Sequence, residues 1–398
     1  MTVMQKISRL TASDVVRELE PDVPLLCLRP EELRKKARTF VESFPGDVLY
    51  AVKCNPDAEV LSHLVDGGIT HFDAASMAEI RQVRSVLPDA VIHFMHPVKA
   101  RSAIRSAYFE HGVRDFVLDS FAELNKILAE TKNATDLVLV VRLAMPKGQA
   151  VYDLSGKFGA APNDAAALLK ACAKVAAKVG LSFHVGSQCI DPSAYERALD
   201  LTGQVLAQSG VALDVLDVGG GFPVAYADVQ PPPLSHFFAA INRGVAKLDL
   251  PAHCRLWCEP GRALVAEGQS VVVQVQAKKG GALYINDGVY GTLADAGAAV
   301  GLRFPMRMVN SKRQGRLRAF EFFGPTCDSA DRMRGPFLLP SDIQVGDWIE
   351  IGQVGAYGRV LSTGFNGFDE ILRATVDDRP PVEDVGAVLV PLKSVRAA

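Results

Sequence analysis

Short apolar runs rich in β-branched residues alternate with longer amphipathic segments from about residue 47 onward. The runs predict eight strands, at 47–53, 71–76, 91–96, 115–120, 137–144, 181–187, 215–221 and 255–261. Between the strands, segments such as 165–179 and 193–208 have the 3.6-residue periodicity of helices. Strands that alternate with helices form a parallel sheet, and eight of them close a (β/α)8 barrel. The pattern therefore predicts an α/β fold built on such a barrel.

The pattern changes after Arg262, where short alternating strands are separated by Gly, Pro and Asp turns. These strands are expected within 269–280, 282–288, 316–324, 347–352 and 374–378. Such a texture predicts an antiparallel β domain, which the early apolar run 24–30 can join as a strand. We therefore divide the chain into an N-terminal segment contributing to the β domain (1–30), a (β/α)8 barrel (31–265) and a β-rich C-terminal domain (266–398).

Composition narrows the class of protein. The 398 residues are 48% hydrophobic and 22% charged, and the net charge of −2 offers no basic field for nucleic acid. The first twenty residues lack the apolar core of a signal peptide, and no apolar run is long enough to span a membrane. Seven scattered cysteines without a CxxC pair favour reduced thiols over disulfides or zinc. We expect a cytoplasmic enzyme without a metal.

Polar residues stand at nearly every predicted strand end. Barrel enzymes place their chemistry at the carboxyl ends of the strands, and a purely structural barrel does not need polar groups there. The residues at these ends are Lys53, Asp73, Ser76, His96, Asp119, Arg142, His184, Ser187, Gly219, Gly220, Gly221, Glu259 and Arg262. Their convergence predicts a functional site at the barrel mouth.

Lys53 ends the first apolar strand and is expected to point into that mouth. Partial desolvation there lowers the pKa of a lysine and frees its amine to form an imine. An isolated lysine at a strand end is more commonly a solvated side chain. The functional interpretation of Lys53 therefore depends on the other strand ends.

Two strand ends carry the features of a phosphate site. Gly219, Gly220 and Gly221 let backbone N–H groups approach an anion, and Arg262 after the eighth strand can pair with a phosphate. Barrel phosphate sites lie after strands seven and eight, although a glycine-rich turn alone is more often only a tight turn. Glu259 can keep a pyridine nitrogen protonated, which makes the ring an electron sink, or it can pair with Arg262.

The histidines are weaker signals. His184 can stack on a planar cofactor with Ser187 on its phosphate, but a lone strand histidine is more often a hydrogen-bonded core residue. His93 and His96 are an odd number of positions apart on one strand, so they face opposite sides and make poor metal partners.

Taken in order, the motifs YAVKCN, FDAASMAEI, HVGSQ, DVGGGFP, EPGR and GPTCDSAD resemble those of the fold type III (alanine-racemase-fold) pyridoxal-phosphate-dependent decarboxylases. The ornithine and lysine decarboxylase branch fits best, from about residue 24 to Phe368. The resemblance implies a carboxy-lyase that converts ornithine or lysine to putrescine or cadaverine and CO2 in polyamine biosynthesis. It also implies pyridoxal 5′-phosphate as cofactor and a homodimer with shared active sites.

The resemblance assigns roles to matching positions. Lys53 resembles the lysine that carries the cofactor as an imine, His184 the ring-stacking residue, and Glu259 the partner of the pyridine nitrogen. Cys327 resembles a proton donor supplied to the neighbouring subunit. Further cofactor contacts are implied at Asp73, Arg142, Ser187, Gly219, Gly220, Gly221, Gly261, Arg262 and Tyr357. Substrate contacts are implied at Asp328, Asp295, Tyr290 and Phe365, and an interface pair at Lys157 and Asp331.

The chain also departs from these relatives, which leaves the substrate open. The segment 291–304 is shorter than in eukaryotic ornithine decarboxylases, and Asp295 is the candidate there for a second acidic substrate contact. Diaminopimelate decarboxylase is the main alternative, although its motif usually reads Cys-Glu-Ser where this chain has Cys327-Asp328-Ser329. A non-catalytic pyridoxal-phosphate-binding regulator is another, but the presence of Lys53 and Cys327 favours an active enzyme.

Overall fold

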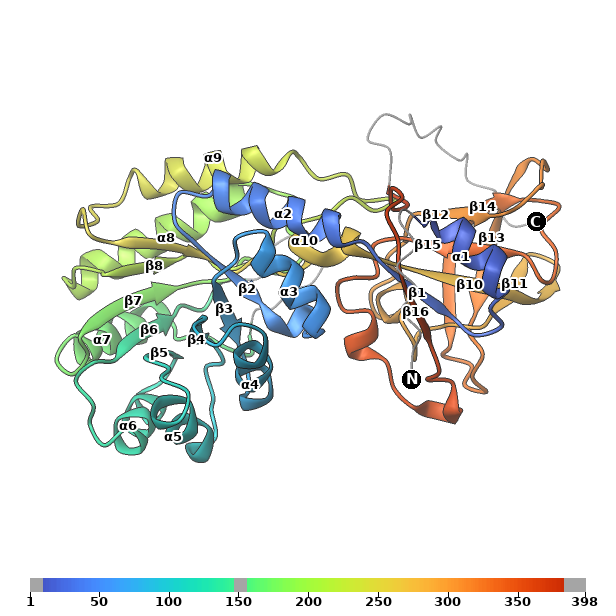
Figure 1. The fold of residues 1–398 in the computed structure, drawn as a ribbon. Coiled ribbons are helices and arrows are strands. Elements are labelled where there is room, and N and C mark those ends of the chain that lie inside the picture. The colour runs from blue at the N-terminus through green and yellow to red at the C-terminus, as the bar shows by residue number, and fades with distance from the viewer. Residues whose placement is uncertain (1–9, 147–155, 383–398) are drawn as a thin grey trace.

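The computed structural model describes residues 10–146 and 156–382, and these form two units (Figure 1). The first is a closed barrel of eight parallel strands, with β2 pairing to β9 to complete the circle. Its strands are β2 Asp47–Ala51, β3 His71–Ala74, β4 Val91–Phe94, β5 Asp115–Leu118, β6 Val138–Arg142, β7 Lys178–Ser182, β8 Val215–Asp217 and β9 Arg255–Cys258. The predicted (β/α)8 barrel is confirmed.

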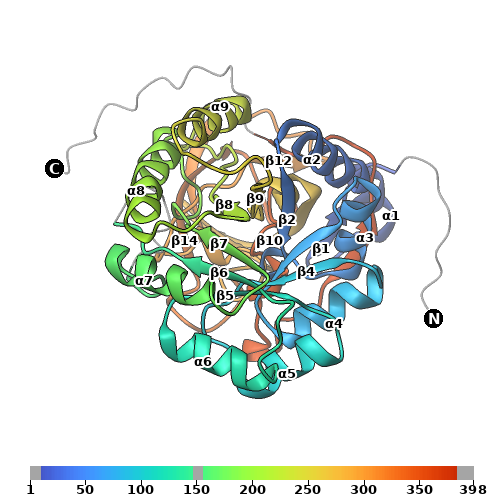
Figure 2. The same cartoon turned by 90° about the vertical axis from the view of Figure 1, so that its left-hand side faces the viewer.

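Helices surround the barrel (Figure 2). They are α2 Pro30–Ser43, α3 Ala58–Asp66, α4 Met77–Val86, α5 Arg101–Phe109, α6 Phe121–Glu130, α7 Pro162–Cys172, α8 Ser193–Ser209 and α9 Leu234–Val245. Side-chain caps fix some of their starts: Ser76 accepts from the Glu79 amide at α4, and Ser120 from the Glu123 amide at α6. Within the described ranges, the helices are too short or too polar to cross a membrane.

One predicted helix was too long. The alanine-rich segment 165–179 was expected to be helical throughout, but α7 ends at Cys172 and β7 begins at Lys178. Val179 pairs with Leu139 of β6, and a Cβ on Gly180 would meet the Val215 side chain of β8 at 3.0 Å. The repeating alanines and lysines continue past the end of α7, so the periodicity still indicates a helix there. Strand pairing in the sheet overrides this helical tendency, and the sequence pattern alone does not reveal the pairing.

The second unit is a mixed sheet with the main order β12-β15-β10-β11-β13-β14. Its strands are β1 Leu25–Leu28, β10 Gln269–Lys279, β11 Ala282–Ile285, β12 Met306–Val309, β13 Leu317–Phe323, β14 Arg332–Pro340, β15 Trp348–Ile351 and β16 Leu372–Thr375. As predicted, the early run joins this sheet, because β1 pairs antiparallel with β10. Most pairings are antiparallel, but β1 with β16 and β11 with β13 are parallel. Strands β12 and β14 were not predicted.

Helix α1 (Ala12–Leu19) precedes β1 and packs on this second unit. A capping box starts it: the Thr11 hydroxyl accepts from the Asp14 amide, and Asp14 accepts from the Thr11 amide. Its Val15 and Val16 lie in a small apolar cluster with Leu25 of β1. The N-terminal segment therefore packs on the C-terminal sheet, although the two are separated by most of the sequence. The outer ends of the proposed 1–30 and 266–398 domains lie outside the described residues.

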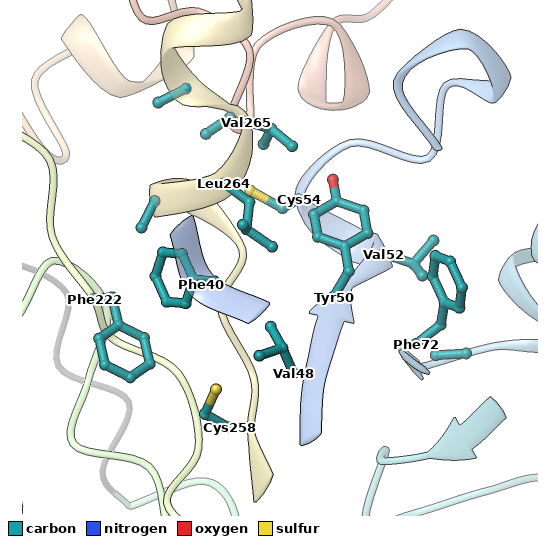
Figure 3. Close-up of a cluster of buried hydrophobic side chains, with 14 of the residues drawn as sticks. Phe40, Val48, Tyr50, Val52, Cys54, Phe72, Phe222, Cys258, Leu264 and Val265 are labelled. Carbon is teal, nitrogen blue, oxygen red and sulfur yellow. The ribbon is translucent and has the colours of Figure 1, made fainter. Parts of the chain in front are cut away.

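The turn after β2 joins the two units. Figure 3 shows Tyr50 and Cys54 packed with apolar side chains of the barrel wall and of α10 (Arg262–Val265). The Tyr50 hydroxyl donates to the Asn55 carbonyl at 2.9 Å. The side-chain Nδ2 of Asn55 donates to Gln269 Oε1 (3.0 Å) and to the Gly355 carbonyl (2.8 Å) of the second unit. The short helical turn Val52–Cys54, which carries Lys53, is thus fixed from both sides.

Candidate active site

Lys53 lies at the carboxyl end of the barrel strands with a 44% exposed side chain. Its Nζ donates to Asp73 Oδ2 at 2.6 Å, and Asp73 itself is only 2% exposed. Burial acts to lower the pKa of Lys53, but the carboxylates of Asp73 and Glu259 outweigh it, so the pKa is raised. The expectation of a lowered pKa was therefore wrong, because the short distance between Lys53 and Asp73 cannot be predicted from their positions in the sequence. Lys53 is held as a cation that faces the barrel mouth.

Glu259 follows β9 and is buried. Its backbone N–H donates to the Gly219 carbonyl at 2.8 Å, which ties together the ends of β8 and β9. Burial, and then the neighbouring Asp217 and Asp73 carboxyls, raise the pKa of Glu259 well above its usual range. A buried carboxyl in this position is matched to a cationic partner, such as a protonated ring nitrogen.

The glycine turn after β8 accepts no side chains. A Cβ on Gly219, where φ is +68°, would lie 2.2 Å from the Phe183 carbonyl oxygen, and one on Gly220 would lie 2.5 Å from that of Glu259. The Gly219 amide donates to Asp217 Oδ1 at 2.8 Å. Because the Gly219 amide is already bonded, Gly220 and Gly221 are the glycines whose bare backbone suits close approach by a phosphate, and the anion contacts of this turn stay a prediction.

His184 stands in the loop after β7 and faces the glycine turn. Its Nε2 would lie 3.1 Å from a Cβ on Gly220, and its Nδ1 accepts from the Gly186 amide at 3.0 Å. Burial, and then the charges of Arg142 and Lys53, lower the pKa of His184 well below its usual range. Ser187 is half-buried in the same loop. A neutral imidazole thus lines the mouth beside the predicted phosphate turn.

Arg262 is buried at the start of α10 and has several partners. It donates through Nη1 to the Tyr226 hydroxyl (2.9 Å) and through Nη2 to Asp295 Oδ2 (3.0 Å). Its guanidinium carbon lies 5.0 Å from the centre of the Tyr357 ring. Tyr357 is anchored by its amide, which donates to the Cys54 carbonyl at 3.0 Å. These contacts gather three side chains, those of Tyr226, Asp295 and Tyr357, around the predicted phosphate arginine.

Asp295 and Tyr226 thus both contact the predicted phosphate arginine. Asp295, the candidate for a second acidic substrate contact, is buried against Arg262, and its contact with substrate stays a prediction. Tyr226 was missed, because a tyrosine in the loop after β8 carries no signal that it reaches a residue 36 positions later. Gly261, also predicted, lies where a Cβ would come within 3.2 Å of Cys54 Cβ.

Four other predicted residues meet on the second unit. The Tyr290 hydroxyl donates a short hydrogen bond to Asp328 Oδ2, and Asp328 Oδ1 accepts from the Ala330 amide at 2.9 Å. The Phe365 ring lies 4.9 Å from the Tyr290 ring. Cys327 is exposed, and its amide donates to Asn366 Oδ1 at 3.1 Å. We call Tyr290, Cys327, Asp328 and Phe365 the acidic-aromatic cluster.

Asp331 lies beneath this cluster. It is 1% exposed and accepts from the amides of Val289 (2.8 Å) and Thr326 (3.1 Å) and from the Thr326 hydroxyl (2.8 Å). Lys157 is exposed, with its Nζ 5.0 Å from the Phe158 ring centre. Asp331 is thus hydrogen-bonded within its own chain, and its implied pairing with Lys157 across an interface stays a prediction.

Comparisons with known proteins agree with this geometry. The family model for the pyridoxal-binding domain of pyridoxal-dependent decarboxylases matches residues 30–266. The lysine/ornithine decarboxylase of Selenomonas ruminantium is 31% identical, over 84% of this chain and 84% of that protein. The ornithine decarboxylase of Schizosaccharomyces pombe is 34% identical over 80% and 75%. Antizyme inhibitor 2 of Xenopus laevis is 31% identical over 85% and 77%.

Solved structures extend the likeness to the whole fold. The lysine/ornithine decarboxylase of Vibrio vulnificus, complexed with cadaverine, superposes with a TM-score of 0.79 at 32% identity and covers 93% of this chain and 100% of that one. The arginine decarboxylase of Paramecium bursaria Chlorella virus, bound to agmatine, also has a TM-score of 0.79. It is 27% identical, over 91% of this chain and 99% of that one.

Proposed function

The chain belongs to the pyridoxal-dependent decarboxylases, and from that membership we propose that it removes CO2 from a basic L-amino acid of the ornithine or lysine type. It is a pyridoxal-phosphate-dependent amino-acid decarboxylase. The cofactor supplies the electron sink that stabilises the negative charge left when CO2 departs. The protein supplies binding, orientation and proton positions.

The barrel mouth fits this cofactor. Lys53 Nζ would be the attachment point, and Asp73 Oδ2, at 2.6 Å from it, orients it toward the mouth. Glu259, which is buried and hard to ionise alone, would hold a proton at the ring nitrogen. Gly220, Gly221 and Arg262 would bind the phosphate, and the neutral His184 would pack on the ring. Arg142, at the end of β6, adds positive charge to the mouth near His184.

The acidic-aromatic cluster carries the proposal for the substrate. Asp328 is a half-buried carboxylate beside the Tyr290 and Phe365 rings, next in sequence to the predicted proton donor Cys327. A carboxylate there favours a substrate tail that ends in an ammonium and repels the second carboxylate of diaminopimelate. Relatives named for lysine and ornithine, and a solved structure with cadaverine bound, support the same class of substrate.

We further propose that the working enzyme is a homodimer in which each barrel mouth receives the cluster of the partner. Cys327 is exposed on the second unit, whereas Lys53 belongs to the barrel. An exposed thiol with a carboxylate and two aromatic rings beside it is suited to complete a site on another surface. In that site the Cys327 thiol returns a proton to the carbon that has lost CO2.

An amine-product assay of the cofactor-loaded protein tests the substrate. Ornithine, lysine, arginine and diaminopimelate are supplied separately, and products are separated by chromatography. We expect putrescine or cadaverine, with far slower reaction of diaminopimelate. Turnover of diaminopimelate with neither ornithine nor lysine accepted would overturn the substrate class. If protein with bound cofactor formed no amine from any of the four amino acids, a non-catalytic regulator would be favoured instead. One relative, antizyme inhibitor 2, has a name of that kind.

A further inference from the structure

Asp217, the last residue of β8, has an incomplete hydrogen-bonding pattern. It is 0% exposed, and its Oδ1 accepts from the Gly219 amide at 2.8 Å. Its Oδ2 is buried and receives no hydrogen bond from any residue in the described part of the chain. A buried carboxylate oxygen without a donor is costly, so this oxygen calls for a partner.

The side chain close to Asp217 is a second carboxyl group, that of Glu259. Asp217 pairs in register with Trp257 of β9, and Glu259 lies two residues further along the same direction. The side chains of Asp217 and Glu259 are within hydrogen-bonding reach of each other. Two carboxylates cannot bond to one another, and like charges in a buried site repel, so one of the pair must hold a proton.

The surrounding charges do not remove this need. Around the pair stand charged and titratable groups from the other barrel strands, namely Lys53, Asp73, His93 and Arg142. Lys53 is already bound to Asp73 at 2.6 Å, and His93 contacts Asp115 at 3.1 Å on the far side of the barrel core. Burial raises the pKa of Asp217 to about 6 and raises the pKa of Glu259 well above its usual range, so without a cationic partner the shared proton lies on Glu259.

We propose that, once the ring nitrogen of the cofactor faces Glu259, the proton shared by the two carboxyls lies on Asp217, which donates it in a hydrogen bond to Glu259. Asp217 is then a positioning residue that keeps the Glu259 carboxylate charged toward that nitrogen. This inference rests on the role proposed above for Glu259. With Asp217 as donor, the Glu259 carboxylate is a weaker base, so the shared proton stays on the ring nitrogen. Without that donor, a buried Glu259 draws the proton to itself and the ring becomes a poorer electron sink.

Two variants separate this role from a purely structural one. In Asp217→Asn the amide still donates to Glu259 and its oxygen still accepts from Gly219, so the geometry and the donor both survive. In Asp217→Val the shape is similar but both bonds are lost. The readout is the ¹⁵N chemical shift of the ring nitrogen in enzyme loaded with ¹⁵N-labelled pyridoxal phosphate, followed against pH, together with kcat.

We expect Asp217→Asn to keep the ring nitrogen protonated and kcat within about threefold of wild type, since an equivalent hydrogen bond remains. Asp217→Val should shift the ring nitrogen toward its unprotonated signal and lower kcat by about 10- to 100-fold, the range for losing one hydrogen bond to a charged group. Asp287→Asn is the matched control. Asp287 is also buried, with a pKa raised to about 6 by burial, but it bonds to Gly288 and Thr292 in the second unit. It should leave the ring signal unchanged.

An unprotonated ring in Asp217→Asn, or a wild-type signal in Asp217→Val, would overturn the proposal. If the valine variant fails to fold, infrared difference spectra of the cofactor-loaded protein decide. Wild type minus Asp217→Asn should show a protonated-carboxyl band, and absence of that band from the difference spectrum overturns the proposal. Glu259→Gln separates the two proposals, because a ring that stays protonated in that variant contradicts the role of Glu259 itself.

Discussion

The barrel mouth and the acidic-aromatic cluster are built in opposite ways. At the mouth, Asp73, Asp217 and Glu259 are buried. Their carboxyl groups repel one another when charged and are attracted to Lys53. In the cluster, Cys327 is exposed and Asp328 is satisfied by the local Tyr290 hydroxyl and Ala330 amide. The mouth is an electrostatic site enclosed by its own chain, whereas the cluster is a surface that one chain displays.

This difference separates two tasks. Holding a cofactor and tuning the proton on its ring need low dielectric and fixed partners, which the barrel core provides. Selecting a substrate tail and returning a proton need groups that the substrate can reach, and these are the roles proposed above for the cluster. Substitutions in the mouth should therefore change the chemistry of every substrate, and those in the cluster should change which substrate is used.

The largest effect is expected from Lys53→Ala. Loss of the attachment amine should lower kcat by at least about 10³-fold, as loss of a covalent catalytic group does in other enzymes. Borohydride reduction of wild type followed by peptide mapping should place the cofactor label on Lys53, and the alanine variant should take no label. A label on another lysine in wild type would remove Lys53 from the site.

Mixing two inactive variants tests whether mouth and cluster come from different subunits. Lys53→Ala and Cys327→Ala chains, once exchanged, form hybrid dimers with one intact site if each site uses both chains. Random assortment makes half of the dimers hybrids, so recovery should reach roughly a quarter of wild-type activity. Failure to recover activity after subunit exchange has been verified would show that each site uses one chain only.

Glu259→Gln should retain cofactor but lose at least about 10²-fold in kcat, comparable to removing one strong electrostatic contact from an active site. The neutral amide cannot hold the ring proton as a carboxylate does. Steady-state kinetics with ornithine and lysine should show the same loss for both substrates. A loss confined to one substrate would indicate that Glu259 contacts the substrate and not the cofactor.

A smaller and more selective effect is expected from Asp328→Asn. It should lower kcat/KM for ornithine or lysine by about 10- to 150-fold, which corresponds to the 1.5–3 kcal/mol of a charge-assisted contact. Cofactor absorbance should stay unchanged. Asp342→Asn, a change to an exposed aspartate of the same sheet unit that bonds only to nearby amides, serves as the control. An equal loss in that control would make the effect of Asp328 non-specific.

The sequence was sufficient where a residue's environment follows from strand order. All eight barrel strands could be predicted from apolar runs, and Lys53, His184 and Glu259 from their places at strand ends, because parallel strands bring those ends together. It was insufficient where distance decides. The raised pKa of Lys53 depends on Asp73 at 2.6 Å, the partner of Asp295 is Arg262, and the buried Asp217 lies within hydrogen-bonding reach of Glu259. Strand β14 was not predicted, because its glycine and proline at 335 and 336 resemble a turn.

The pairing of β1 also determines the order in which the protein can be assembled. Leu25 to Leu28 leave the ribosome before the barrel, but their partners in β10 and β16 follow only after the barrel has been made. Arg29, next to β1, bonds to Ser270 and Asp378, which lie 241 and 349 positions later. Domains generally fold as units during synthesis, so the barrel can close while β1 waits unpaired. A nascent or truncated chain that stops before Gln269 therefore carries an apolar strand with open edges, which makes it a substrate for chaperones or aggregation.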